Sequence, residues 1–229
     1  MDASERALAL RAVADEAAGC TRCPLAAGRT AVVFGEGDPD ADLALVGEAP
    51  GFHEDRAGTP FAGRSRELLE RLLAGIGLAL EDVYLATALK CRTPGNRDPS
   101  PDETAACEPY LYRQLELVRP RVVATLGSFA TTLLSGRALG ITRVHGREQQ
   151  VTLGGRSVTL VPLYHPAAAL YTPTMLEVLE EDVRRLGELL AGHDGPCGDS
   201  PQALPATHSR ALLEVGGAAG RQPVQLGLF

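Results

Sequence analysis

The 229 residues of this chain suffice for one domain of ordinary size with a sizeable core and an appendage. A composition of 45% hydrophobic and 22% charged residues is that of a globular protein, which excludes general disorder and collagen-like structure. The net charge of −7 argues against attraction of nucleic acid to the whole surface, but it is compatible with a local basic groove. No apolar run approaches the roughly 18–20 residues of a membrane span, and the charged N-terminus lacks a secretory core. We therefore expect a cytoplasmic protein without membrane contact.

Short apolar runs alternate with segments of helical periodicity. After a helix-forming N-terminus we expect, in chain order, a strand at 43–46, a helix at 65–76, a strand at 83–89, a helix at 102–118, a strand at 122–126, a helix at 128–134, a strand at 158–163 and a helix at 174–190. This alternation predicts an α/β fold, a mostly parallel sheet with helices on both faces. Residues 192–224 are rich in Gly, Pro, Ala and Ser without periodicity, which predicts a disordered linker.

Polar residues follow the carboxyl ends of the predicted strands, where open α/β sheets bind ligands. The first strand runs into Glu48, the second contains Thr87, the third ends at Ser128 and the fourth runs into His165. A single Glu or His is more often structural, but four separated segments converging on one edge favour a site. A histidine on a stiff turn can donate to a developing anion or act as acid or base.

Four cysteines form a C-x2-C…C-x15-C pattern: Cys20, Cys23, Cys91 and Cys107. Four thiolates can hold a tetrahedral zinc or an iron–sulfur cluster, and buried unpaired cysteines are the third interpretation. The wide spacing of the second pair favours the bulkier cluster, because a zinc ribbon normally uses two tight knuckles. Such a site would join the N-terminal segment to a basic loop that carries Arg92 and Arg97.

A series of motifs resembles the family-4 iron–sulfur uracil-DNA glycosylases from Cys20 to about Leu190. The motifs are CPL at 23–25, GRT at 28–30, VFGEG at 33–37, VGEAPG at 46–51, ED at 54–55, GTPFAG at 58–63, KCRTPGNR at 90–97 and HPA at 165–167, interleaved with the four cysteines. The resemblance implies a three-layer α/β/α sandwich on a four-stranded parallel sheet over residues 1–191, and a 4Fe–4S cluster on the four cysteines. It also implies a DNA repair enzyme that flips uracil out of single- or double-stranded DNA and hydrolyses its N-glycosidic bond. No lysine lies near the motifs except Lys90, next to a predicted cluster ligand, so we expect no Schiff-base step and a monofunctional enzyme, which we also expect to be a monomer.

The resemblance also assigns roles to individual residues. Glu48 and Ala49 would line the uracil pocket, with Glu48 acting on water or on the sugar. Glu54 would border the mouth, Phe61 would stack on the base, and His165 would donate to uracil O2. The family usually has asparagine where this chain has Thr87, so one hydroxyl replaces an amide in reading the base.

Contacts to DNA are predicted on two grounds. Residues 137–156 contain four arginines against one acid, and residues 90–97 contain three bases and no acid, so phosphate contacts are expected at Arg92, Arg97, Arg143 and Arg147. The alternative is an ordinary solvated surface. The loop after His165 would push into the duplex through Leu170 and Tyr171, where the usual family form has an arginine.

The chain ends in QLGLF, which looks like the bacterial sliding-clamp-binding peptide over residues 225–229. Leu226, Leu228 and Phe229 would act as apolar anchors and Gln225 would fix the register, with an incidental apolar end as the alternative. Two rival functions stay open: a zinc protein that binds nucleic acid, and a damage-binding relative with little or no turnover.

Overall fold

The structure, a computed structural model, describes residues 1–192. The predicted linker, apart from Gly192, and the predicted terminal peptide at 225–229 lie outside the described residues. The helices and strands are α1 (Ala3–Ala18), β1 (Glu36–Gly37), β2 (Leu43–Gly47), α2 (Phe52–Ala57), α3 (Gly63–Ala74), β3 (Tyr84–Thr87), α4 (Pro101–Val118), β4 (Val122–Leu126), α5 (Ser128–Ser135), α6 (Ile141–Val144), β5 (Gln149–Leu153), β6 (Arg156–Leu163), α7 (Pro166–Ala169) and α8 (Pro173–Gly192). Short 3₁₀ turns lie at Pro24–Ala27, Leu80–Asp82 and Pro94–Asn96.

All strands belong to one sheet in the order β1-β3-β2-β4-β6-β5. The inner strands β3, β2, β4 and β6 are parallel, as predicted from the four apolar runs. Every residue of β2, β3 and β4 is buried, which explains why these strands read as continuous apolar runs rather than as alternating ones.

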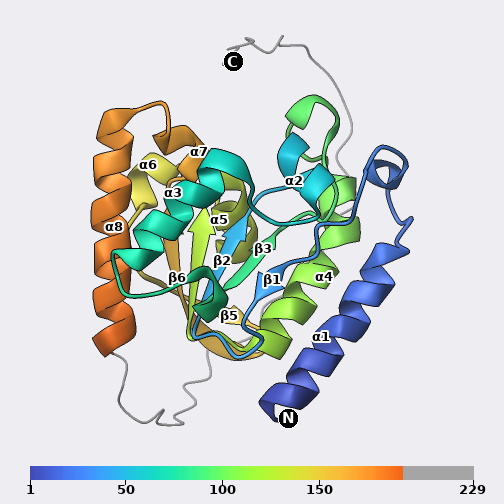
Figure 1. Ribbon diagram of the computed structural model, residues 1–229, viewed down its shortest axis with the longest axis horizontal. Coiled ribbons are helices and arrows are strands. Elements are labelled where there is room, and N and C mark those ends of the chain that lie inside the picture. Colours follow the sequence, from blue (N-terminus) through green and yellow to red (C-terminus); the bar gives the residue numbers. More distant parts are fainter. Residues whose placement is uncertain (193–229) are drawn as a thin grey trace, which may run out of the picture. The chain divides into compact units, whose positions relative to one another are not determined.

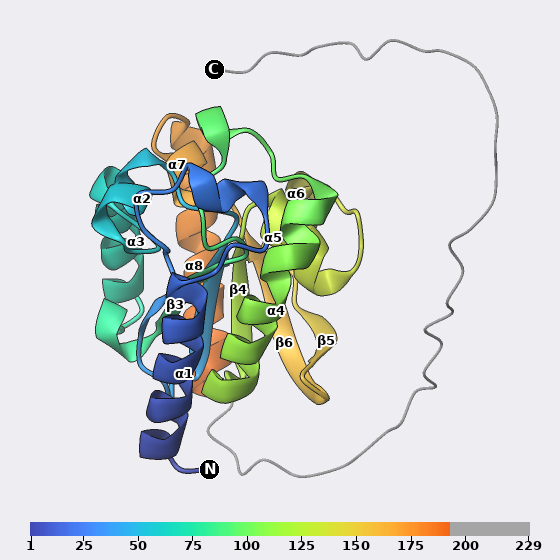
Figure 2. The same ribbon diagram turned by 90° about the vertical axis from the view of Figure 1, so that its right-hand side faces the viewer.

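The prediction of a four-stranded parallel sheet is wrong in number, because the sheet has six strands and is mixed. β1 and β5 pair antiparallel with β3 and β6 at the two edges. β1 is too short to show periodicity, and β5 alternates between partly buried and exposed residues. Figure 2 shows β5 and β6 side by side, joined by Gly154 and Gly155, both with positive φ, as a two-residue hairpin turn requires.

Helices cover both faces of the sheet, so the predicted three-layer α/β/α sandwich is confirmed (Figure 1). Side chains alternate along β2, with Ala44 and Val46 packing on the face covered by α1, α4 and α5. Leu43 and Leu45 point to the opposite face, which is covered by α3 and α8. Both cores are built of Leu, Val and Ala, and together they hold the strand ends rigidly.

Capping residues determine where the helices close to the carboxyl ends of the strands begin and end. A capping box between Ser100 and Glu103 starts α4, with Pro101 in its first turn. Gly58 ends α2 and Gly136 ends α5 in left-handed conformations. Among the described helices, none is both long enough and apolar enough to cross a membrane.

Candidate active site and cysteine pocket

A cavity of about 910 Å³ opens where the parallel strands end. Its walls come from the loop after β2, the end of β3, the segment around Phe61 and the turn after β6. Among the residues predicted from the sequence, those that line this cavity are Glu48, Ala49, Glu54, Phe61, Thr87, Arg97, His165, Leu170 and Tyr171. Segments far apart in the sequence thus form one concave site.

His165 is held as a neutral imidazole with a defined tautomer. Its Nδ1 accepts a hydrogen bond from the backbone N–H of Ala167 at 3.1 Å, so the ring proton must lie on Nε2. Pro166 stiffens the turn in the first position of α7. Burial lowers the pKa of His165 to about 4, so the ring is uncharged at neutral pH. The site therefore contains a neutral N–H donor, the electrostatic element suited to a developing anion.

Phe61 forms an aromatic wall beside this donor. It is buried, and its ring centroid lies 6.1 Å from that of His165, with the ring planes tilted by 33°. A Cβ at Gly47 would lie 3.3 Å from the tip of Phe61 and 3.5 Å from the methyl of Thr87. Glycine at the end of β2 therefore lets both side chains approach the backbone closely.

Thr87 lines the cavity and is held by Lys90, which does not itself line it. The buried Thr87 hydroxyl donates to the carbonyl of Leu89 at 2.7 Å, which uses its only donor and leaves the oxygen as an acceptor. The Lys90 ammonium is also buried and donates to the Thr87 carbonyl at 2.6 Å. Burial lowers the pKa of Lys90 to about 7. The lysine is thus a packed, structural group rather than a group open to solvent.

Glu48 is the carboxylate of the inner cavity. Burial and, second, the negative charge of Asp98 raise its pKa above the usual glutamate range. Within residues 1–192, its side chain has no hydrogen-bond partner, while its backbone carbonyl accepts from Leu89 N–H at 2.9 Å. A carboxylate with free oxygens in a cavity can orient water or face a positive charge.

Glu54 and Asp55 organise the mouth of the cavity. Glu54 accepts from the backbone N–H of Ala62 at 3.0 Å, which ties α2 to the segment that carries Phe61. The neighbouring Asp55 is 3% exposed and accepts from Thr30 N–H at 2.9 and 3.1 Å. In the sequence Asp55 stands out only as part of the ED motif at 54–55, so its anchoring role was not predicted.

The two arginines of the basic loop differ in their partners. Both Nη atoms of Arg97 bind Glu103, at 2.8 and 2.6 Å, and Glu103 is almost fully buried at the start of α4. This pair holds the loop against α4. Arg92 donates to Asn96 at 3.0 Å and lies 5.1 Å from the ring centroid of Phe52. Within residues 1–192, Arg92 has no carboxylate partner, so its positive charge is more available to a phosphate.

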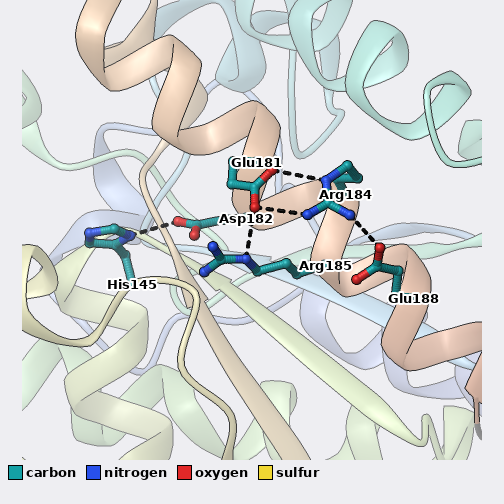
Figure 3. A network of polar contacts seen from close by, with 6 residues as sticks. All are labelled: His145, Glu181, Asp182, Arg184, Arg185 and Glu188. Atoms are coloured by element: carbon teal, nitrogen blue, oxygen red, sulfur yellow. Dashed lines mark hydrogen bonds and ion pairs between the residues drawn. The ribbon is translucent and has the colours of Figure 1, made fainter.

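Arg143 and Arg147 do not line the cavity, although they lie near the end of β6. Both are exposed and flank His145, whose Nδ1 lies 2.7 Å from the buried Asp182 carboxylate of α8 (Figure 3). The neighbouring Gly146 N–H donates to the Pro162 carbonyl at 2.8 Å. These contacts fix the segment that carries both arginines beside the turn of His165.

Figure 3 also shows a second polar group on α8, in which arginines are paired with acids. Arg184 binds Glu181 and Glu188, and Arg185 binds Glu181. Their charges are neutralised locally, so they add little to a positive face.

The two residues predicted to enter the duplex have different environments. Leu170 is partly buried and packs against the core between the sheet, α3 and α8. Tyr171 is 79% exposed at the edge of the cavity. Tyr171 is thus the residue of the pair that is free to contact a ligand.

All four predicted cysteines line a second, smaller pocket on the other side of the Thr87–Cys91 segment. All four are free thiols, and burial raises the pKa of Cys91 and Cys107. Positive and N–H groups oppose that shift: Arg29 Nη1 lies 3.5 Å from the sulfur of Cys91, and Lys90 N–H lies 3.2 Å from the sulfur of Cys107. These groups offset only part of the shift, because the pKa of both thiols remains above its ordinary value.

Across the part of the chain that the structure describes, no three Cys, His, Asp or Glu side chains are grouped so as to hold a single metal ion. Four thiols around one pocket supply the ligand count of either a tetrahedral zinc or an iron–sulfur cluster.

Other residues at the mouth of the cavity were also not predicted from the sequence. Phe52, His53, Arg64 and Asn96 line the cavity but follow no periodic pattern. Their position beside the GEAPG segment and the basic loop is the one signal that could have indicated them.

Comparisons with known proteins identify the family. The sequence matches the family model for the uracil DNA glycosylase superfamily over residues 34–187. It is 44% identical to the type-4 uracil-DNA glycosylase of Archaeoglobus fulgidus over 178 residues, covering 76% of this chain and 89% of that protein. It is 40% identical to the type-4 uracil-DNA glycosylase of Thermotoga maritima over 176 residues, covering 76% of this chain and 90% of that protein. A type-5 uracil-DNA glycosylase of Pyrobaculum aerophilum is less similar, at 32% over 164 residues, covering 62% and 71%. The chain therefore belongs to the uracil DNA glycosylase superfamily and, within it, to the type-4 uracil-DNA glycosylases.

Proposed function

We propose that the chain is a DNA repair enzyme that binds a uracil flipped out of DNA in the cavity after β2, β3 and β6 and hydrolyses its N-glycosidic bond. The observation that carries the proposal is the neutral His165, with its proton on Nε2, beside the buried ring of Phe61. Bond cleavage leaves a uracil anion and a positively charged sugar, so a preorganised donor acts where charge develops.

In this mechanism the base stacks on Phe61 and uracil O2 accepts from His165 Nε2–H. Because the Ala167 N–H fixes Nδ1 as the acceptor, the Nε2–H donor is in place before substrate binds. Removing one such donor typically lowers the rate about 10²–10³-fold. Extrusion of the base costs a few kcal/mol, and least for an unpaired uracil, which contributes to selectivity.

Glu48 acts on the opposite side of the broken bond. Its carboxylate, free of hydrogen-bond partners among residues 1–192, orients the attacking water and stabilises the positive charge on the sugar. Water adds to the sugar carbon, uracil leaves with the bonding electron pair, and the product is an abasic site. Ala49 and Glu54 shape the entrance.

Thr87 reads the base by accepting, not by donating. Its hydroxyl hydrogen is used by the Leu89 carbonyl, so the oxygen can accept from the N3–H of uracil. Cytosine has an unprotonated N3 and cannot donate there. One acceptor gives less discrimination than the paired donor and acceptor of an amide.

The four cysteines are proposed to hold a 4Fe–4S cluster. Cys20 and Cys23 come from the N-terminal segment, Cys91 from the loop after β3 and Cys107 from α4, so the group would join three separate parts of the chain. When bound, it supplies a rigid covalent link rather than a reacting atom. Lys90 connects both sites, since its N–H lies against Cys107 and its ammonium binds the Thr87 carbonyl.

The reaction stops at base release. Lys90 is the only lysine of the chain; it is 1% exposed, does not line the cavity and donates to the Thr87 carbonyl. A Schiff base with the opened sugar needs an accessible amine. We therefore expect an uncleaved abasic strand as the product.

Further expectations concern partners and location. Arg92, Arg97, Arg143 and Arg147 are proposed phosphate contacts, with Arg97 the weakest candidate because it already pairs with Glu103. Leu170 and Tyr171 are proposed to contact the duplex. A monomeric, cytoplasmic enzyme that binds the sliding clamp through Gln225, Leu226, Leu228 and Phe229 stays a prediction, tested by clamp pull-down with and without the last five residues.

A damage-binding relative with little turnover is the second candidate, and the single acceptor at Thr87 is the observation that favours it. A steady-state assay of uracil release from labelled single- and double-stranded oligonucleotides separates the two. The proposed enzyme yields free uracil and an alkali-sensitive, otherwise uncleaved strand. Binding without release over many hours would support the second candidate.

A further inference from the structure

We propose that Phe52, together with Arg56 and Arg92, forms a subsite for the nucleotide adjacent to the flipped uracil, with the base of that nucleotide stacked on the Phe52 ring. The inference rests on the proposed function, because it places a second nucleotide of the same single DNA strand at the mouth of the same cavity.

The first observation is the exposure of the ring. Phe52 is 45% exposed, although phenylalanine normally lies inside. Within residues 1–192, the large hydrophobic side chains that are exposed are Met1, Leu8, Phe52, Leu139 and Tyr171. The two aromatic ones among them, Phe52 and Tyr171, both line the cavity. Exposed apolar side chains that gather at one cavity indicate a ligand-binding surface, unlike those scattered singly over a protein.

The second observation is the positive charge beside the ring. The guanidinium carbons of Arg92 and Arg56 lie 5.1 and 5.5 Å from the Phe52 ring centroid, within the range of cation–π contact. Within residues 1–192, neither arginine has a carboxylate partner, in contrast to Arg97. An aromatic platform next to unpaired arginines matches the chemistry of a single-stranded nucleic acid, in which bases stack and phosphates bind.

The third observation is the size of the cavity. At about 910 Å³ it lies at the upper end of the range that encloses drug-sized ligands, whereas a single pyrimidine base is much smaller. In the proposed function, the uracil fills only the inner end of the cavity, between Phe61, Thr87 and His165. The outer end, lined by Phe52 and His53, therefore has room for a neighbouring nucleotide.

The substrate would be a strand whose neighbouring base is unpaired. In a duplex that base is stacked and paired, so occupying the Phe52 platform requires opening a second base pair. The subsite therefore favours uracil in single-stranded DNA over uracil in a perfect duplex.

The test compares three single-stranded oligonucleotides that contain one central uracil. One is intact, and in each of the others the neighbour on the 5′ or the 3′ side is replaced by a base-free tetrahydrofuran nucleotide. We expect Phe52→Ala to raise KM on the intact strand at least about fivefold with little change in kcat. On the strand that lacks the stacked base, the same variant should change KM less than twofold. Phe52→Trp should retain the wild-type KM, and Phe52→Leu should resemble Phe52→Ala.

Matched controls come from α1, outside the cavity. Leu8→Ala removes a side chain that is 68% exposed and should leave KM unchanged. Arg56→Gln and Arg92→Gln should each reduce the salt dependence of log Kd by about 0.7, whereas Arg11→Gln should not. Thermal unfolding of each variant checks that the fold is retained.

The outcomes separate this subsite from the proposed function. An unchanged KM for Phe52→Ala on the intact strand, or an equal loss on all three strands, would overturn the subsite while leaving uracil excision in place. If the wild-type protein releases no uracil, the proposed function fails, and the subsite is then decided by fluorescence anisotropy on the same three strands. Equal Kd values for wild type and Phe52→Ala in that experiment would reject it.

Discussion

The inner end and the mouth of the cavity differ in how far their side chains are exposed to solvent. At the inner end, Phe61 and Thr87 are 3% and 2% exposed, and His165 has its tautomer set by a backbone N–H. At the mouth, Phe52 and Tyr171 are 45% and 79% exposed. We infer that the inner end is organised before substrate arrives, whereas the proposed contacts of the mouth form only with DNA. Changes at the inner end should therefore reduce kcat, and changes at the mouth should raise KM or alter salt dependence.

The largest effect is expected at the inner end. His165→Asn should lower the single-turnover rate of uracil release about 10²–10³-fold, because the oriented neutral donor is lost. Binding of a uracil-free strand should change little, since His165 is assigned to the leaving base. An equal loss of affinity for that strand would show that His165 contributes to DNA binding rather than to bond cleavage.

A change in the cysteine pocket tests whether the inner end of the cavity depends on the proposed cluster. Cys107→Ser should abolish stoichiometric iron and sulfide and lower the free energy of unfolding by more than about 3 kcal/mol, because three parts of the chain lose their link. Iron analysis and denaturant unfolding measure both. A variant that lacks iron but keeps full stability and full activity would show that the two pockets are independent.

The pH dependence separates the two titrating groups. In the proposed mechanism Glu48 acts as a carboxylate, and burial raises its pKa, so the rate should fall as pH decreases through that raised value. His165 should add a second fall only near pH 4. Glu48→Gln should remove the first fall, although the remaining rate is lower. A pH–rate profile of the variant with the wild-type shape would assign that fall to another group.

A smaller effect, a gain in kcat/KM, is expected at Thr87, the residue proposed to contact the edge of the base. Thr87→Asn supplies an amide donor and acceptor in place of one acceptor and should raise kcat/KM for uracil about five- to tenfold. The ratio of uracil to cytosine release should rise as well. Thr87→Ser, which keeps the hydroxyl, is the matched control. Unchanged discrimination in Thr87→Asn would indicate that Thr87 does not face the base edge.

The smallest effects are expected outside the cavity. Arg143→Gln and Arg147→Gln should each reduce the slope of log affinity against log salt by about 0.9 on duplex DNA, with kcat unchanged. Arg184→Gln is the control, because this arginine is already neutralised by Glu181 and Glu188. Equal slopes in all three variants would place Arg143 and Arg147 on the solvated surface.

The contrast between the two ends also explains what the sequence could predict. The buried parallel strands and the residues that follow them were predictable, since apolar runs locate the strands and the sheet edge gathers Glu48, Thr87 and His165. The edge strands were not: β1 has two residues, and β5 is half exposed. The Gly154-Gly155 turn was the available signal for the hairpin with β6.

At the site, the motifs pointed to the residue types but not to their partners. The exposed ring of Phe52, the engagement of Arg97 by Glu103 and the anchoring of Thr30 by Asp55 depend on contacts between distant segments. Such contacts leave no periodic trace in a single sequence. The mouth was consequently less predictable than the inner end.

The protonation state of His165 is the most direct test of this account. Histidine-labelled protein, measured by ¹H–¹⁵N correlation between pH 8 and pH 5, reports both ring nitrogens, and the signal is assigned by its loss in His165→Asn. We predict a neutral ring with its proton on Nε2 throughout that range, since the pKa is lowered to about 4 by burial. A ring that titrates between pH 6 and 7, or carries its proton on Nδ1, would contradict the central claim.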